Sequence, residues 1–262
     1  MRRLIHATRF GITPLLSLVL FVPAATALGD TFFSNTASIS IPATTGGGSL
    51  PVTSSPYPSQ ITVSGMVGTL TDVAVTLNGW TDNGTSANPG DLYFLLTGPG
   101  GQAFEFMGDV GSDNPITNVT LTLTDSASAV LTSGGITSGS FKPTVLGGPA
   151  CAAFPAPAPS PGTDCAGPRG TSTFFDLFDD SGLDPDGTWS LYIIDNTPGD
   201  TASTISRGWS VEVESTGGYV APPPPSVPEP SSLALVGLAM GVVALRRVWC
   251  PNRRDGWGSI PI

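Results

Sequence analysis

DGTWSLYIID (residues 186–195) and GWSVEVES (residues 208–215) decide which fold this chain can adopt. Large apolar side chains recur at every second position of both stretches, as Trp209, Val211 and Val213 do in the second. Because alternate side chains of a β-strand point to the same face, each stretch predicts a strand with one apolar face. Such a face must be buried against another layer, which favours two packed sheets.

The same period of two recurs through the middle of the chain, where helical periodicity is nearly absent. Further alternating apolar sets are Trp189, Leu191 and Ile193; Val73, Val75 and Leu77; and Val119, Leu121 and Leu123. Residues 91–96 are almost all apolar, which predicts a central strand covered on both faces. Turn-forming clusters of Gly, Pro, Asn and Asp separate these runs. We therefore predict an all-β fold, an antiparallel jelly-roll-like β-sandwich, for residues 28–215.

The N-terminus has the pattern of a secretory signal peptide. Three arginines in the first nine residues precede an apolar stretch at 12–22, and Ala25 and Ala27 supply the small residues that signal peptidase prefers. We predict an N-terminal signal helix, export through the Sec machinery and cleavage after Ala27, which would remove residues 1–27. An uncleaved N-terminal anchor is the alternative, although the apolar stretch is short for a membrane span.

A second apolar run, residues 233–245, lies near the C-terminus. As a helix it would extend for roughly 20 Å, less than the ~30 Å of a bilayer core, so length alone fits a buried core helix equally well. The flanks favour a short membrane helix, because a Pro-rich linker at residues 216–226 precedes it and Arg246 and Arg247 follow it. Basic residues after an apolar run stay on the cytoplasmic side, which predicts a basic cytoplasmic tail at residues 248–262.

The C-terminal region contains Pro228, Glu229 and Pro230, then the apolar run, then Arg246 and Arg247. Together, at residues 227–247, these features resemble the PEP-CTERM sorting signal of Gram-negative bacteria. The resemblance implies that an exosortase recognises the protein, which would be anchored transiently in the inner membrane and then reach the cell surface or extracellular matrix. It also implies a link to exopolysaccharide and biofilm. The tail is longer than the few basic residues usual in that family.

A second set of motifs covers most of the exported domain, from about residue 61 to residue 214. Its pieces are GDLYFLL (90–96), GPGG (98–101), DGTWSL (186–191), Asp195-Asn196, GDT (199–201) and GWSV (208–211). In this order they resemble the P domain (P/Homo B) of proprotein convertases, although Ala202 and Ser203 replace an expected Gly. The resemblance implies a β-sandwich, and it raises the expectation of Ca²⁺, which P domains of bacterial proteases often carry. Since P domains usually follow a subtilisin-like protease domain, an accessory role for a separate serine protease is one alternative function.

Four residues of this second set have expected structural roles. Trp189 and Trp209 are expected to be large core residues on adjacent strands that close the domain. Asp195 and Asp200 are expected to cap the turn between these strands through side-chain to backbone hydrogen bonds. For all four residues a structural role is favoured over contact with a ligand.

The exported part is strongly acidic and lacks histidine. Between residues 30 and 228, only Lys142, Arg169 and Arg207 oppose eighteen Asp or Glu, a net charge of −15. Such a surface repels phosphate backbones, so nucleic acid is not a predicted partner. The only histidine, His6, lies in the signal peptide, so the mature domain lacks the imidazole of Ser-His-Asp and His-ligated zinc sites. We predict a non-catalytic protein; a carboxylate pair of the glycosidase type is the enzymatic alternative.

No cofactor is certain from the sequence, but the acidic loops could hold Ca²⁺, since this ion takes about six to eight oxygen ligands. Three candidate sets are Asp82, Asn83 and Asp91; Asp109 and Asp113; and Asp180, Asp184 and Asp186. Solvated turns are the alternative for each set. With Ca²⁺ bound, the domain would be a Ca²⁺-dependent carbohydrate- or protein-binding module, and extracellular polysaccharide would be a partner. Trp80 and Tyr57 are candidates for stacking on sugars, with core packing as the alternative.

Cys151 and Cys165 lie in a Pro- and Ala-rich segment, within residues 147–170, that we expect to be a mobile insertion. In an oxidising compartment we expect them to form a disulfide rather than two free thiols. Closing a loop of about 15 residues is worth roughly 3 kcal/mol in the chain-entropy model. Because no third cysteine and no histidine lies nearby, a metal site is not expected here, and Cys250 is expected to be unpaired.

Overall fold

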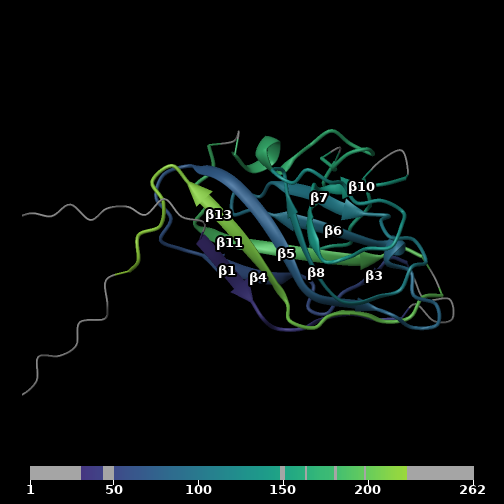
Figure 1. The fold of residues 1–262 in the computed structure, drawn as a ribbon. Coiled ribbons are helices and arrows are strands. Elements are labelled where there is room, and N and C mark those ends of the chain that lie inside the picture. Colours follow the sequence, from purple (N-terminus) through teal and green to yellow (C-terminus); the bar gives the residue numbers. More distant parts are fainter. Residues whose placement is uncertain are drawn as a thin grey trace, which may run out of the picture. The chain divides into compact units, whose positions relative to one another are not determined.

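The computed structural model describes residues 31–43, 50–147, 151–162, 164–179, 182–197 and 199–222. The predicted signal peptide (1–27), sorting signal with its membrane helix (227–247) and cytoplasmic tail (248–262) lie outside these residues. The β-sheets belong to the unit Met1–Ala221, and a second unit begins at Pro222 (Figure 1). None of the helices in the described part has the length and apolar character needed to span a bilayer.

The first sheet contains seven strands among the described residues. They are β1 (Thr31–Asn35), β2 (Ile39–Ile41), β5 (Leu70–Asp82), β8 (Ile116–Thr124), β9 (Gly139–Phe141), β12 (Ser203–Ile205) and β13 (Trp209–Ser215). The long strand β5 is central: β8 is antiparallel to it on one side, and β12 and β13 are antiparallel to it on the other. Strands β1 and β2 extend the sheet beyond β13 and β12, and β9 pairs in parallel with β8.

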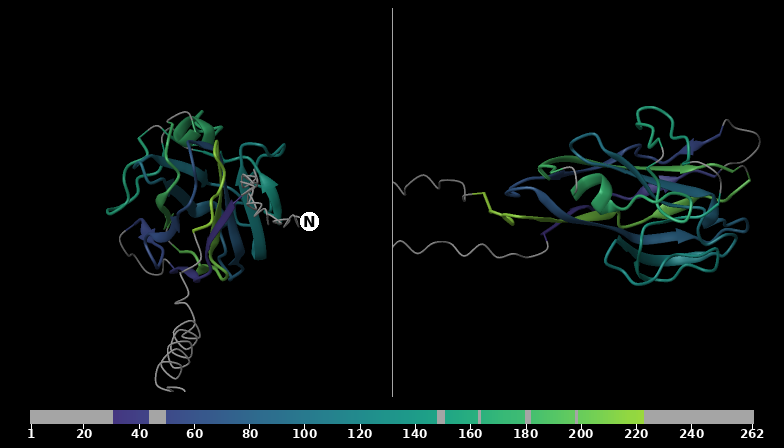
Figure 2. Two further views of the ribbon diagram at one scale, coloured as in Figure 1. Left: turned by 90° about the vertical axis from the view of Figure 1, so that its left-hand side faces the viewer. Right: turned by 90° about the horizontal axis from the view of Figure 1, so that it is seen from above.

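The second sheet contains six strands among the described residues. They are β3 (Val52–Thr53), β4 (Ser59–Val63), β6 (Leu92–Thr97), β7 (Ala103–Gly108), β10 (Thr144–Val145) and β11 (Gly187–Asp195). Strand β11 lies between β6 and the pair β4 and β3, while β7 follows β6 and is joined in parallel by β10. The helical segments are a 3₁₀ turn, η1 (Pro89–Asp91), and a π-helical turn, η2 (Phe175–Asp179). The predicted all-β sandwich is confirmed, and Figure 2 shows its sheets from two further sides.

Three tryptophans fill the space between the sheets. Trp80, Trp189 and Trp209 are all 0 % exposed, and each indole N–H has a hydrogen-bond acceptor. The indole of Trp209 donates to Ser59 Oγ, in a strand of the opposite sheet, at 3.0 Å. The expectation that Trp189 and Trp209 lie on adjacent strands is wrong, because β11 belongs to the second sheet and β13 to the first. Trp80 as a surface residue for sugar stacking is wrong as well, since it is fully buried.

Strand β6 is covered on both faces, as the apolar run at residues 91–96 predicts. Phe94 and Leu96 point into the core between the sheets, while Leu95 packs on the outer face with Tyr192 and Phe154. Phe154 belongs to the cysteine-containing segment, which therefore serves as a cover for the outer face of the second sheet. This role explains why so many small apolar residues occur in it.

Tyr57 also packs against this cover. Its ring lies edge-on to Tyr192, with 5.0 Å between the ring centroids, and its hydroxyl donates to Pro155 O at 3.0 Å. Burial raises the pKa of the Tyr57 hydroxyl, and the neighbouring Tyr192 contributes to the same shift. Tyr57 is thus a packing residue, which is the alternative that the sequence left open.

The chain remains attached to the sandwich beyond the last strand. The N–H groups of Thr216, Gly217 and Val220 donate to the carbonyls of Thr69, Val67 and Gly65, at 2.9, 2.7 and 2.8 Å. We call this backbone pairing of residues 216–220 with residues 65–69 the C-terminal clasp. The linker expected at residues 216–226 is therefore part of the sandwich over its first five residues.

Candidate functional site

Four aspartates gather where strands of both sheets end. Asp82 is the last residue of β5, and Asp195 is the last residue of β11. Asp91 ends the 3₁₀ turn η1 immediately before β6, and Asp200 lies shortly before β12. We call these four residues the aspartate cluster.

Strand pairing explains why residues so distant in sequence meet here. Strands β6 and β11 are antiparallel, with Asp195 opposite Leu92, so Asp91 and Asp195 lie at the same end of the sheet. The N–H of Asn196 donates to Asp91 O at 3.0 Å and extends this pairing by one bond. Asp82 joins from the other sheet, and its carboxylate interacts electrostatically with both Asp195 and Asp91.

Short-range hydrogen bonds orient two of these carboxylates. The amide Nδ2 of Asn88 donates to Asp91 Oδ2 at 2.6 Å, while Asn88 Oδ1 accepts from Gly90 N at 3.2 Å. Asp195 Oδ1 accepts from Thr197 N at 3.1 Å, a local bond of the kind expected for an aspartate in a turn. These bonds fix the side chains before any ligand arrives.

The cluster concentrates negative charge in a poorly solvated place. Burial, followed by repulsion from neighbouring aspartates, raises the pKa of Asp82 to about 6, and burial raises that of Asp195 to about 6. Burial raises the pKa of Asp200 to about 7, helped by a hydrogen bond to Asp91 and by the charge of Asp91. The described part of the chain supplies no cationic side chain that lowers the pKa of these three groups.

Asp82 shows most clearly that the cluster is incomplete. Its side chain is only 2 % exposed, yet Oδ1 accepts no hydrogen bond from the described residues. The Thr201 side chain is close enough for a hydrogen-bonding interaction that lowers the pKa of Asp82, although neither Asp82 Oδ1 nor the Thr201 hydroxyl makes a well-formed hydrogen bond within the described part of the chain. A buried carboxylate oxygen without a donor costs free energy, on the order of 1–3 kcal/mol or more for a charged group.

A polar cavity of about 340 Å³ adjoins the cluster. Ser86, Asn88, Asp113 and Asp200 contribute to its lining, so the cavity shares Asp200 with the cluster and also includes Asn88, which donates to Asp91. A Cβ atom at Gly84, which also lines the cavity, would overlap the side chain of Thr201. A glycine is needed there for Thr201 to reach the cluster.

These residues have the chemistry of Ca²⁺ ligands, although their carboxylates are not gathered as closely as a metal-sized group: among the described residues, the acidic or cysteine side chains whose ligand atoms lie within 4.8 Å of one another are Glu105, Cys151 and Cys165. They offer carboxylate, amide and hydroxyl oxygens, the hard ligands that Ca²⁺ prefers, and the site lacks the nitrogen or sulfur ligands of a transition metal. Asp82 Oδ1 supplies the independent sign of a missing positive partner. When bound, such an ion would supply charge compensation and would hold the ends of both sheets together.

The structure brings together only part of each predicted Ca²⁺ set. Asp82 and Asp91 meet in the cluster, whereas Asn83 is exposed and donates to Thr117 Oγ1 at 3.2 Å. Asp109 lies at the margin: burial raises its pKa, Arg169 lowers it, and Asp91 raises it. Asp113 lines the cavity.

The third predicted set has a different role in the described residues. Both carboxylate oxygens of Asp186 accept backbone N–H groups, from Met66 and Gly65, at 2.9 Å each. Asp184 Oδ1 accepts from Asp186 N at 3.1 Å. These two aspartates secure a turn against the neighbouring loop, and Asp180 lies outside the described residues.

Sequence reasoning missed Asp195 and Asp200 as site residues because both were assigned to a turn. Asp195 could have been placed in the site if the strands at residues 91–96 and 186–195 had been predicted to pair. Two adjacent antiparallel strands place the start of one beside the end of the other, so Asp91 had to lie near Asp195.

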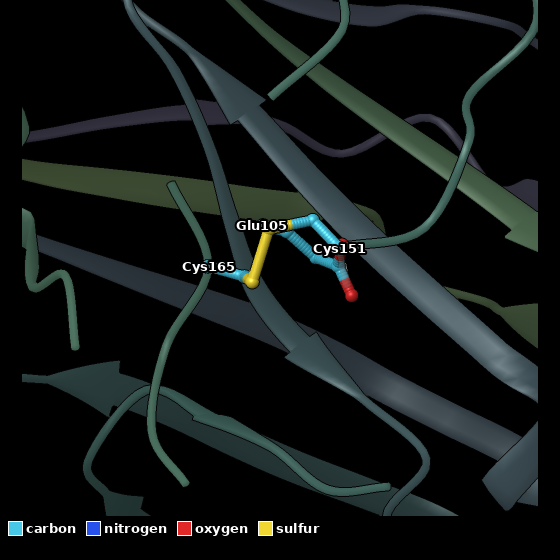
Figure 3. Close-up of side chains that lie close together, drawn as sticks. All are labelled: Glu105, Cys151 and Cys165. Atoms are coloured by element: carbon cyan, nitrogen blue, oxygen red, sulfur yellow. A yellow bond between two sulfur atoms is a disulfide. The ribbon is translucent and has the colours of Figure 1, made fainter. Parts of the chain in front are cut away.

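A second polar group occurs on the outer side of the second sheet (Figure 3). The structure joins Cys151 and Cys165 in a disulfide, with 5.7 Å between their Cα atoms. A carboxylate oxygen of Glu105, which is 0 % exposed in the middle of β7, lies within 4.8 Å of both sulfurs. Glu105 was missed at the sequence level, although a glutamate inside the apolar run at residues 103–108 was a visible signal.

Comparison with known proteins identifies one region of the chain. The family model of the PEP-CTERM protein-sorting motif matches residues 226–248, which confirms the sorting motif predicted at residues 227–247. No curated protein and no solved structure matches the chain. The motif supports an exported protein that an exosortase recognises and that is sorted at the membrane toward the cell surface.

Proposed function

We propose that this chain is an exported, non-catalytic protein of the cell surface or extracellular matrix, which an exosortase-type system delivers. The observation that carries the proposal is the sorting motif at residues 226–248, which follows a sandwich ending in the C-terminal clasp. In this proposal the Sec machinery and signal peptidase process the N-terminus, and the C-terminal segment anchors the protein transiently in the inner membrane. The acidic domain then becomes part of a matrix of exopolysaccharide.

We further propose that the sandwich is of the P-domain type. The motif pieces that carry this resemblance are scattered over about 120 residues of sequence, from Gly90 to Val211. In the structure, the piece at residues 90–96 forms η1 and β6, the piece at 186–191 begins β11, and the later pieces supply Asp195 and Asp200. Three of the pieces, at residues 90–96, 195–196 and 199–201, each contribute one aspartate to the cluster, which supports a common structural purpose for that part of the pattern.

The sorting proposal predicts a loss of processing when the motif is changed. The full chain would be expressed in a Gram-negative host with and without its exosortase, and Pro228, Glu229 and Pro230 would be replaced together by alanine. We expect the wild-type protein to be shortened at its C-terminus only where the exosortase is present, and the triple variant to stay at full length in the membrane fraction. Immunoblots of cell fractions measure both outcomes.

Pro225→Ala, in the linker but outside the tripeptide, is the matched control and should be processed like the wild type. Equal shortening in cells that lack the exosortase would contradict the proposed route.

A second function is favoured by the cavity beside the aspartate cluster. The cavity is polar and shares Asn88 and Asp200 with the candidate Ca²⁺ site, so an ion and a hydroxyl-rich ligand would lie next to each other. Binding sites need a concave surface with convergent polar groups, which this end of the sandwich provides. On this reading the protein is a Ca²⁺-dependent carbohydrate-binding module.

Glycan-array binding of the full chain tests this second function. We expect binding in the presence of Ca²⁺, loss of binding after addition of a chelator, and loss in Ser86→Trp, whose indole would fill the cavity. Ser128→Trp places the same indole at an exposed position that does not line the cavity, and it should bind like the wild type. Binding that survives both the chelator and Ser86→Trp would exclude this cavity as the glycan site.

A further inference from the structure

The disulfide region is built around Glu105 (Figure 3). The main chain of Glu105 bonds to both neighbours of Cys165: Glu105 N donates to Asp164 O, and Ala166 N donates to Glu105 O, each at 3.0 Å. Its side chain reaches the other half of the disulfide, because Ala152 N donates to Glu105 Oε2 at 2.5 Å. Glu105 therefore holds the backbone next to both cysteines.

The two cysteine residues differ in burial. Cys165 is 2 % exposed, whereas Cys151 is only partly buried. An external thiolate must approach a disulfide sulfur directly, along the line opposite the sulfur that leaves. Cys151, as the less buried residue of the pair, is the better candidate for that attack.

We propose that Cys151 and Cys165 form a thiol–disulfide exchange site for an external dithiol, with Glu105 as the proton donor to Cys165. A thiolate of the dithiol attacks Cys151 Sγ; a new sulfur–sulfur bond forms there, and the bond to Cys165 breaks. The electron pair of that bond passes to Cys165 Sγ, which takes the proton of the Glu105 carboxyl group. The second thiolate of the dithiol then displaces Cys151, which takes a proton from water. The protein gains two electrons and the dithiol becomes a disulfide.

The surroundings of Glu105 suit a group that exchanges protons near neutral pH. Burial raises the pKa of Glu105 to about 7, while the Ala152 N–H and the charge of Arg169 act in the opposite direction. Arg169 Nη1 lies 3.4 Å from Glu105 Oε1, and its guanidinium lies over the ring of Tyr93, 5.4 Å from the centroid. Asp109 is a further charged neighbour: burial raises its pKa, and the charge of Arg169 acts in the opposite direction. A proton donor works best when its pKa is close to the working pH.

The purely structural alternative makes different predictions. If Glu105 only anchors the cover segment, its protonation has no effect on the rate of reduction. The rate would then follow the thiolate concentration of the reductant alone, because the thiolate is the attacking species. The pH dependence of the normalised reduction rate therefore distinguishes a proton-donating Glu105 from a Glu105 that only anchors the segment.

The test uses the full chain with Cys250→Ser, so that only the two cysteines of the disulfide react. The rate constant for reduction by dithiothreitol is measured from pH 5 to 9 by quenching with a maleimide, and is divided by the fraction of dithiothreitol thiolate. We expect the normalised rate constant to fall as the pH rises through about 7, where Glu105 loses its proton. In Glu105→Gln the profile should be flat and, at pH 6, at least about tenfold lower than the wild type.

Glu212→Gln, on the first sheet, is the control and should keep the wild-type profile. A second measurement does not depend on the folding of any variant at Glu105. The protein is treated with glutathione and the adduct is located by mass spectrometry, with Cys151 as the expected site. An adduct at Cys165, or a flat normalised profile in the wild-type protein, would overturn the proposal.

Discussion

Millimolar Ca²⁺ will raise the Tm of this protein by about 5–10 °C, and Asp82→Asn will remove most of that increase. A ligand that binds only the native state at about 100 times its Kd adds about 2.7 kcal/mol, and each kcal/mol shifts the Tm of a domain of this size by about 2–4 °C. Asp82 is chosen because its buried Oδ1 accepts no hydrogen bond from the described residues. Differential scanning calorimetry with Ca²⁺ and with a chelator measures the shift.

The same experiment has a pH dependence whose sign follows from the cluster. The pKa values of Asp82 and Asp195 are raised from 3.8 to about 6, and that of Asp200 to about 7, so the native state holds protons that the unfolded chain releases. Without Ca²⁺, the protonated aspartates contribute fully to the free energy of unfolding below pH 3.8. This contribution is lost as the pH rises through 6 to 7 and the native state releases these protons. Ca²⁺ should therefore stabilise most above pH 7, where the aspartates are ionised.

Asp184→Asn is the matched control for Asp82→Asn. Asp184 accepts a local turn bond from Asp186 N, which an amide oxygen can also accept, and it lies outside the cluster. This variant should retain the full Ca²⁺ shift. An equal shift in Asp82→Asn, or no shift in the wild type at pH 8, would mean that the cluster does not bind Ca²⁺.

Trp209→Ala will lower the free energy of unfolding by about 3–5 kcal/mol, the usual cost of removing a buried aromatic side chain. Trp209 is 0 % exposed between the two sheets, so the substitution leaves a cavity. It also removes the hydrogen bond to Ser59 Oγ, so the loss includes a direct link between the sheets. Urea denaturation followed by circular dichroism measures the change.

Phe32→Ala provides the control, because Phe32 lies on the neighbouring strand β1, opposite Glu212, and is 61 % exposed. Its substitution should change the free energy of unfolding by less than about 0.5 kcal/mol. A cost below about 1 kcal/mol for Trp209→Ala would show that the sheets do not depend on this contact.

The sequence predicts the strands better than their partners. Alternation identifies a strand and its buried face, and the apolar run at residues 91–96 correctly predicts a strand with two covered faces. Alternation contains no information about which strand lies next to which. For this reason Trp189 and Trp209 were expected side by side, although the chain passes from one sheet to the other between them.

The same limit applies to the candidate sites. Asp82 and Asn83 are adjacent in sequence, but the first ends β5 and points into the cluster, whereas the second is exposed beyond the end of the strand. Asp195 and Asp200 have no unusual sequence neighbours, and their position in the cluster arises from strands that pair across many residues. Long-range pairing of this kind decides which polar side chains are deprived of water.

The C-terminal clasp has a mechanical consequence. It pairs with residues 65–69, just before β5 begins at Leu70, while the aspartate cluster lies at the other end of β5, roughly 40 Å away along the strand. If the C-terminal segment were held at a membrane and a ligand were held at the cluster, a pulling force between them would act along the axis of β13. It would slide β13 against its neighbours β1 and β5. In this shear geometry the backbone hydrogen bonds on both sides of β13 would bear the force at the same time, and they would not break one after another.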